Sequence, residues 1–128
     1  MKRDLLLFIE DILENINLIE SSTKVARDKF DTNRLLIDAT IRRLEIIGEA
    51  TKNIPDSLRN KYPEIPWKKI AGFRDVIIHG YFGINFDRVW EIINKDISTL
   101  KSQIQKVKDD LDAEEKKKVE KISKWKRK

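Results

Sequence analysis

The sequence predicts an all-α protein, an up-down bundle of four principal helices followed by a basic C-terminal extension. Apolar residues recur at steps of three and four along several stretches, which are separated by proline- or glycine-containing breaks. No run of alternating apolar and polar residues and no Asn-Gly or Asp-Gly turn is present to favour a sheet. A chain of 128 residues is long enough to bury one such core.

The first helix is expected near the N-terminus, where charged residues alternate with apolar ones at a helical period. The apolar positions are Leu5, Phe8, Ile9, Ile12, Leu13, Ile16 and Ile19. Their spacing is typical of an amphipathic helix of about five turns. From Ser21 to Phe30 the period weakens, so we expect a connector with a single helical turn.

The second long helix is predicted to begin after Asp31, an N-cap candidate, and to end before Pro55. Gly48 lies inside its apolar stripe. A glycine within a helix costs roughly 1 kcal/mol relative to alanine. We therefore interpret Gly48 as a point where another helix approaches closely.

The third helix is predicted to run from Trp67 to about Ile78. Pro66 suits its first position, because the N–H that proline lacks would have no hydrogen-bond partner there. Ile70, Ile77 and either Phe73 or Arg74 would face inward. The helix would end near the His79-Gly80 pair.

The fourth helix is predicted to begin after Asn85 or Asp87 and to carry an apolar stripe as far as Leu111. Beyond Leu111 the apolar period thins. We therefore expect a helical domain over residues 1–111. Residues 112–128 would be a basic tail, either an exposed helical extension or disordered.

The positive charge of the chain is concentrated in this tail. Residues 116–128 contain eight basic side chains and one acidic one, whereas residues 1–115 have a net charge of −2, so the chain totals +5. The tail is then either a solvated end or a segment that binds nucleic-acid phosphates.

Residue counts narrow the possible chemistry. The chain has no cysteine and one histidine, so neither a thiolate site nor a multi-histidine metal site is available within it, and no metal or cofactor is expected. The N-terminal apolar run is too short to span a membrane and is not followed by a small-residue cleavage site. We expect a soluble cytoplasmic protein.

His79 and Arg74 are the strongest candidates for chemistry. They lie five positions apart, so they would not share a face on an unbroken helix. If the helix ends at Gly80, both side chains can reach one cleft, and Tyr81 can point to the same place. The alternatives are that His79 interacts with the negative end of the helix dipole and that Arg74 pairs with a nearby acid.

Residues 72–82, Gly-Phe-Arg-Asp-Val-Ile-Ile-His-Gly-Tyr-Phe, resemble the R-x4-H-x-Y signature of the HepT-like family of the HEPN superfamily. The resemblance extends to residues 42–50 in the second predicted helix. It also includes Ile65-Pro66-Trp67 and Val89-Trp90, so it covers most of the chain up to about Gln105.

This resemblance implies a metal-independent endoribonuclease toxin that cleaves RNA in a homodimer cleft, with Arg74 and His79 as the catalytic residues of each protomer. It also implies a partner, an MNT-type nucleotidyltransferase antitoxin that transfers AMP onto Tyr81.

Two further residues are expected to support or modulate the site. Asp75 stands where many relatives have Asn, so it either orients Arg74 or His79 or repels substrate phosphate, and Glu49 is expected to approach the cleft.

The alternative function is a non-catalytic helical dimer that binds a nucleotidyltransferase or a nucleotide. The near-neutral body and Asp75 favour this binding module, whereas the intact Arg74, His79 and Tyr81 favour the enzyme.

Overall fold

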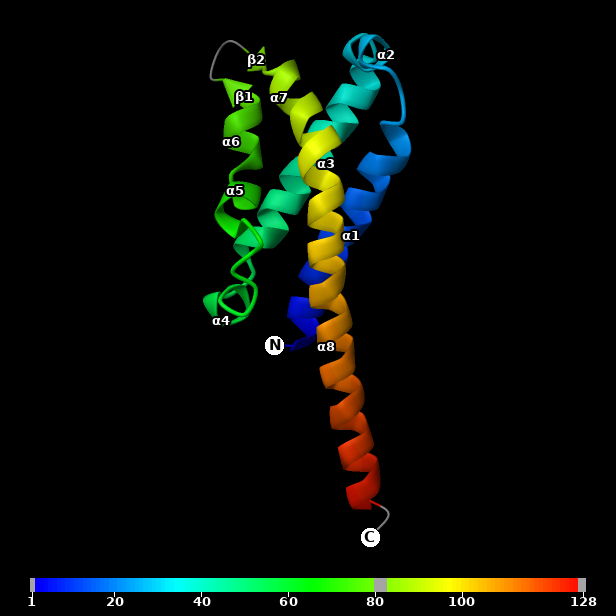
Figure 1. Ribbon diagram of the computed structural model, residues 1–128, viewed down its shortest axis with the longest axis vertical. Helices are drawn as coiled ribbons and strands as arrows, with labels where there is room; N and C mark the ends of the chain where they lie inside the picture. The colour runs from blue at the N-terminus through cyan, green and yellow to red at the C-terminus, as the bar shows by residue number, and fades with distance from the viewer. Residues whose placement is uncertain (1, 80–82, 127–128) are drawn as a thin grey trace.

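Four helical segments run up and down the molecule in the computed structural model, which describes residues 2–79 and 83–126 without the side chains of Lys2, Arg3 and His79 (Figure 1). The all-α fold class is thus confirmed. The principal elements are α1 (Lys2–Ser22), α3 (Arg34–Lys52), the pair α5 (Trp67–Ala71) and α6 (Phe73–Ile77), and the series α7 (Phe86–Glu91), η2 (Ile92–Asp96) and α8 (Ile97–Lys126). Two short helices, α2 (Arg27–Asp31) and α4 (Asp56–Arg59), lie in the connections.

Helix α1 packs against both α3 and α8. Its buried apolar residues follow the predicted stripe, and they are Ile9, Ile12, Leu13, Ile16 and Ile19. Asn15, which is outside that stripe, is buried as well. Hydroxyl groups close the helix, because Ser22 Oγ donates to the Leu18 carbonyl (2.7 Å) and Thr23 Oγ1 donates to that of Ile19 (2.7 Å). The end of α1 is therefore marked by the Ser-Ser-Thr run.

The N-cap of α3 is Asn33 and not Asp31, so that prediction was wrong. The Asn33 side chain accepts a hydrogen bond from the Leu36 N–H at 3.0 Å. Asp31 instead ends α2, and its carboxylate pairs with Arg27 at 3.3 Å. Asp31 and Asn33 both have side chains that can cap a helix. Because α2 extends through Asp31, the N-cap of α3 falls on Asn33.

The predicted third helix is broken in the middle. It divides into α5 and α6 at Gly72, whose N–H bonds to the carbonyls of both Lys68 and Lys69. Pro66 occupies the N-cap of α5 rather than its first helical position. Phe73 is the residue that faces inward, and Arg74 is exposed.

A minimal antiparallel pair of strands, which the sequence did not predict, follows α6. In this pair β1 (Ile78–His79) lies beside β2 (Gly83–Ile84), with Ile78 opposite Ile84 and His79 opposite Gly83. Two residues per strand are too few to produce an alternating sequence pattern. The Asn85 N–H also donates to the Ile77 carbonyl (2.7 Å), which holds the end of α6 next to the start of α7.

The fourth segment begins at a cap that the sequence predicted and contains a feature that it did not. The Asn85 side chain accepts from the Arg88 N–H at 3.1 Å, which makes Asn85 the N-cap of α7. The π-helical turn η2 then separates α7 from α8. Such turns insert one extra residue into a helix and shift the face that it presents.

The connection between α4 and α5 is fixed to α8 by a tyrosine. Tyr62 is buried, and its hydroxyl donates to Asp110 Oδ2 at 2.6 Å. Trp67 Nε1 donates in turn to the Tyr62 carbonyl at 3.0 Å. Burial and the hydrogen bond to Asp110 raise the pKa of the Tyr62 hydroxyl.

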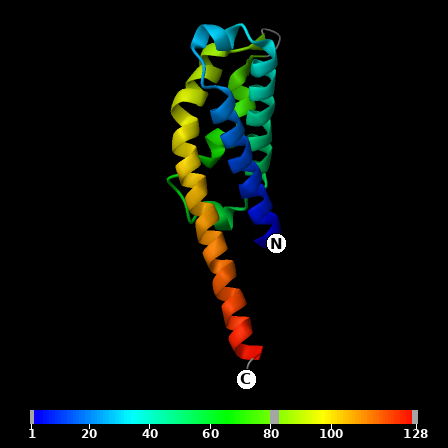
Figure 2. The ribbon, with the colours of Figure 1, turned by 90° about the vertical axis from the view of Figure 1, so that its right-hand side faces the viewer.

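Helix α8 continues well beyond the bundle (Figures 1 and 2). Val107 is its last buried residue, and every side chain from Asp112 to Lys126 is exposed. Of the two alternatives for this segment, the structure has the helical extension. None of the helices in the described ranges is long and apolar enough to cross a membrane.

Candidate functional site

A small cavity of about 90 Å³ lies where α3 meets α5 and α6. It brings together three residues that the sequence singled out, namely Arg74, Asp75 and Glu49. The remaining lining residues are Glu45, Gly48, Lys52 and Ala71. Two sequence stretches that resemble the same family, residues 42–50 and residues 72–82, thus lie side by side at this point. We call it the Arg74 cavity.

Gly48 explains how α5 reaches α3 so closely. A Cβ atom placed on Gly48 would lie 3.3 Å from the Ala71 carbonyl oxygen and 3.4 Å from that of Ile70. These contacts are tighter than a side chain ordinarily makes, and both involve backbone, which cannot rotate away. The close approach inferred from the sequence at Gly48 is therefore present, and it sets the end of α5 just ahead of Arg74.

The Arg74 side chain is exposed at this cavity. Within the described part of the chain its guanidinium forms no ion pair, although Asp75 and Glu49 line the same cavity. The structural alternative, an arginine occupied by a neighbouring acid, is therefore not seen among these residues. An exposed guanidinium that lacks a carboxylate partner retains its donors for an anion such as phosphate.

The charges around Arg74 are mixed. Glu49 pairs with Lys52 at 3.3 Å, and Glu45 lies 3.7 Å from Arg42. The cavity itself carries three carboxylates and two cations. Asp75 forms no ion pair with a described residue, so its negative charge is not offset by direct contact. The surface around the Arg74 cavity of a single copy is therefore not strongly attractive to a polyanion.

For two predicted site residues, His79 and Tyr81, the structure describes only the backbone of His79. The backbone of His79 lies in β1, two residues beyond the end of α6. Its side chain lies outside the described part of the structure, as does the whole of Tyr81. The helix that carries Arg74 ends at Ile77, so His79 lies on a strand rather than at the end of that helix. In the described ranges, no group of three His, Cys, Asp or Glu side chains is placed to hold a metal ion.

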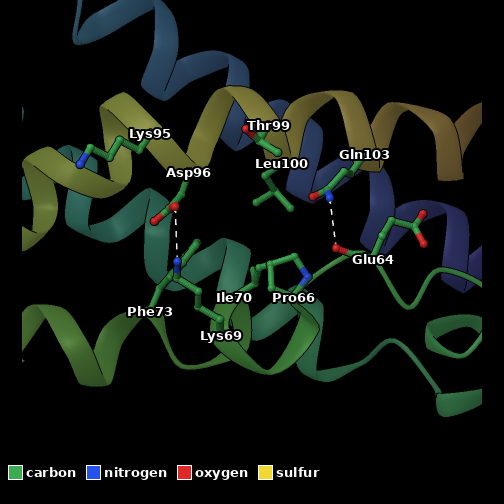
Figure 3. A pocket seen from close by; sticks show the side chains of 10 residues that line it. All are labelled: Glu64, Pro66, Lys69, Ile70, Phe73, Lys95, Asp96, Thr99, Leu100 and Gln103. Atoms are coloured by element: carbon green, nitrogen blue, oxygen red, sulfur yellow. Dashed lines mark hydrogen bonds and ion pairs between the residues drawn. The ribbon is translucent and has the colours of Figure 1, made fainter.

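A second cavity, of about 270 Å³, lies between α5–α6 and the η2–α8 helix (Figure 3). Lys69 Nζ lies 3.3 Å from Asp96 Oδ1, and Gln103 Nε2 donates to the Glu64 carbonyl at 3.2 Å. Asp96 Oδ2 is buried without a hydrogen-bond partner among the described residues. Sequence reasoning missed this cavity because no motif marks it, and the π turn that ends at Asp96 is visible only in three dimensions.

Comparisons with known proteins agree on one family. The sequence profile described as Ribonuclease HepT-like matches residues 12–107. A protein of Thermococcus cleftensis named "Probable ribonuclease HepT" is 42% identical over 109 residues, which are 84% of this chain and 99% of that protein. No solved structure gives a significant match.

A longer relative comes from Methanocaldococcus jannaschii, and its name combines a gamma-glutamylcyclotransferase with a provisional RNase. It is 48% identical over 113 residues, which are 88% of this chain and 51% of that protein. The chain thus spans about half the length of this relative. Together with the profile match, these similarities confirm the resemblance of residues 72–82: the chain belongs to the ribonuclease HepT-like family of the HEPN superfamily.

Proposed function

We propose that this chain is an endoribonuclease that cleaves RNA without a metal ion, in a cleft between two copies of itself. The observation that carries the proposal is the exposed Arg74 guanidinium, which has no ion-pair partner among the described residues and lies just ahead of the strand that contains His79. Membership of a ribonuclease family supports RNA as the substrate.

The reaction needs only a proton acceptor, a proton donor and a cation. The ribose 2′-oxygen attacks the adjacent phosphorus, and its proton passes to the neutral imidazole of one His79. The bond from phosphorus to the 5′-oxygen breaks, and a protonated His79 of the second copy donates a proton to that oxygen. Imidazole suits both roles because its usual pKa is near 6.5. The products are a 2′,3′-cyclic phosphate and a 5′-hydroxyl.

Arg74 would stabilise the charge that builds up on the phosphate oxygens during this attack. Its fork of N–H donors matches two phosphate oxygens at once. A homodimer is part of the proposal because each chain has a single histidine, and the acid and the base are then supplied by different copies. A second copy also brings another Arg74 to the cleft.

We further propose that the enzyme is the toxin of a cytoplasmic toxin–antitoxin pair and that an MNT-type nucleotidyltransferase neutralises it. The resemblance of residues 72–82 to the family signature supports this pairing, and Tyr81 is the proposed acceptor of AMP. An adenylyl group beside Arg74 would add a negative charge where the RNA backbone must bind.

The experiment that tests the proposed activity compares Arg74→Ala and His79→Ala with the unaltered chain on a labelled single-stranded RNA. Loss of an acid–base group costs roughly 10²- to 10⁴-fold in rate, and loss of a donor that stabilises transition-state charge costs roughly 10²- to 10³-fold. We therefore expect strongly reduced or undetectable cleavage from both variants. Arg34→Ala is the matched control, because Arg34 is also exposed and pairs with Asp38 on the same helix, away from the Arg74 cavity. Circular dichroism checks that all three variants remain folded.

The same assay examines the mechanism. Cleavage should persist in EDTA and should leave cyclic phosphate ends. Activity that disappears with EDTA and returns with magnesium would rule out the metal-free reaction. If the unaltered chain binds a nucleotidyltransferase or a nucleotide but cleaves no RNA, the protein is the binding module instead. The three carboxylates of the Arg74 cavity are the observation that favours this second function.

A further inference from the structure

The exposed part of α8 carries an apolar stripe that nothing in the described structure covers. Val119 is 57% exposed, Ile122 46% and Trp125 76%. Ile122 and Trp125 lie, after Glu115 and Lys118, on the face that Leu100, Ile104, Val107 and Leu111 turn toward the bundle, and Val119 lies about a quarter turn aside. A side chain as large as Trp125 on a solvated helix indicates a surface that another apolar surface covers.

The charges on the same helix are separated into two blocks. Residues 109–115 contain five acidic side chains and no basic one, a net charge of −5, and residues 116–126 contain six basic side chains and one acidic one, a net charge of +5. The segment 109–126 is therefore neutral as a whole. It is also regular helix throughout, which gives a rod of about 27 Å.

We propose that residues 109–126 of α8 pair with the same segment of a second copy in antiparallel orientation. An antiparallel arrangement places the acidic block of each copy against the basic block of the other. A parallel arrangement would place like charges together, which is unfavourable. The two blocks have equal and opposite charge, so the partner that complements this segment best is the segment itself.

A two-fold axis near Lys118 places the acidic block of each copy level with the basic block of the other. It sets Leu111 opposite Trp125 of the second copy and Glu115 opposite that copy's Lys121. Leu111 is half-buried against the end of the bundle, so the contact would continue from the core of one copy onto the tail of the other. Because residues 112–126 extend beyond the bundle, the two bundles lie at opposite ends of the pair and do not collide.

Other occupants fit these observations less well. RNA would bind the lysines but leave Val119, Ile122 and Trp125 in water, and its phosphates would be repelled by the acidic block. An anionic membrane surface would cover the stripe, but the acidic block, on the same helix, would be repelled by it. This pairing is separate from the proposed catalytic dimer, since Arg74 lies on α6 and not on α8.

The first test measures mass against protein concentration by sedimentation, using the full chain. We expect a species of twice the mass to form in the micromolar range and to weaken in high salt, since exposed ion pairs are screened. Ile122→Gln/Trp125→Gln should remove this step while circular dichroism shows the helix retained. Val25→Gln/Leu35→Gln is the matched control, because both are exposed apolar side chains that lie outside α8. This control should keep the association.

The second test exchanges charges. Asp112→Lys/Glu115→Lys makes the acidic block nearly neutral and leaves the segment basic overall, and Lys121→Glu/Lys126→Glu makes the basic block nearly neutral. We expect each variant alone to lose self-association by at least about tenfold in Kd, which corresponds to 1.4 kcal/mol. Mixing the two should restore association between different chains.

Orientation is tested by cross-linking, because the natural chain contains no cysteine. Glu115→Cys in one preparation and Lys121→Cys in another should give a mixed disulfide and little of either homodimer. Predominant homodimer disulfides would instead indicate parallel helices and overturn the proposal. So would a full chain whose mass does not change with concentration.

The remaining outcomes identify another occupant and likewise overturn the proposal. If the basic variant binds single-stranded RNA more tightly and mixing restores nothing, the tail is a nucleic-acid arm. If Trp125 fluorescence responds to vesicles of anionic lipid but not to a second copy, the tail is a membrane-surface helix.

Discussion

Gly48 of α3 lies directly against the carbonyl group of Ala71, and a Cβ atom at Gly48 would be 3.3 Å from that oxygen. The contact joins the middle of one long helix to the last residue of α5, three positions before Arg74. A residue without a side chain therefore determines how near the proposed catalytic arginine lies to α3 and to Glu49.

We expect Gly48→Leu to destabilise the fold and to displace α5. Overpacking of this kind costs about 1–3 kcal/mol, and the neighbours here are backbone atoms that cannot rotate away. Gly48→Ala should have a smaller effect on stability, since alanine gains up to about 1 kcal/mol of helix propensity against a tight contact. Urea unfolding measures both. Equal stability of Gly48→Leu and the unaltered chain would mean that α5 is not held by this contact.

We expect Asp75→Asn to increase RNA cleavage. Asp75 makes no ion pair with a described residue, so replacing it should not release Arg74 from a contact. The substitution removes one negative charge from the cavity that is proposed to receive phosphate. A unit charge a few ångströms away in partly solvated surroundings contributes about 1 kcal/mol, or roughly fivefold in kcat/KM.

Glu14→Gln on α1 provides the control for Asp75→Asn, because it makes the same change of charge at an exposed position away from the cavity. A decrease in kcat/KM for Asp75→Asn would show that the carboxylate positions Arg74 or His79 rather than repelling substrate.

We expect Tyr81→Phe to retain cleavage and to resist neutralisation by the nucleotidyltransferase. The hydroxyl is not required as a base or as a phosphate anchor in the proposed reaction, but AMP cannot be attached without it. Intact-mass spectrometry after co-expression with the partner should show AMP-sized increments only on the chain that has Tyr81. Increments on both chains, or on neither, would place the control elsewhere.

We expect Tyr62→Phe to lower stability by about 1.5–3 kcal/mol, the range for a hydrogen bond to a charged group. The acceptor is Asp110 at 2.6 Å. A double-mutant cycle with Asp110→Ala, which removes the acceptor, isolates this pair from other effects of each substitution. If the two changes are additive in urea unfolding, the hydrogen bond contributes nothing to the stability of the folded chain.

The same tyrosine should make the fold sensitive to alkali. Its pKa is raised in the folded protein by burial and by Asp110, so the neutral hydroxyl is the form that folding favours. This stability is fully present below the usual tyrosine pKa of about 10 and is lost as pH rises above it. In a Tyr81→Phe background Tyr62 is the remaining tyrosine, and its tyrosinate absorbance should appear together with unfolding. Tyrosinate formation near pH 10 in a folded chain would contradict the raised pKa.

Helical periodicity was enough to predict the bundle, because each long helix buries one stripe against its neighbours. The apolar residues expected to be inward on α1 are buried from Ile9 to Ile19, and Asn85 caps α7 as one of two candidates. The cap of α3 was misassigned because Asp31 and Asn33 have equivalent capping side chains. Only the length of α2 distinguishes them.

The sequence by itself determined the fold class and the family, since both depend on spacings along one chain: the apolar period and the motif of residues 72–82. It could not determine which residues meet across the bundle. Arg74 and Glu49 line one cavity because Gly48 admits the Ala71 carbonyl, and Asp96 is brought opposite Lys69 at the end of a π turn. Such contacts depend on how close two helices approach and on their rotation, which tertiary packing alone decides.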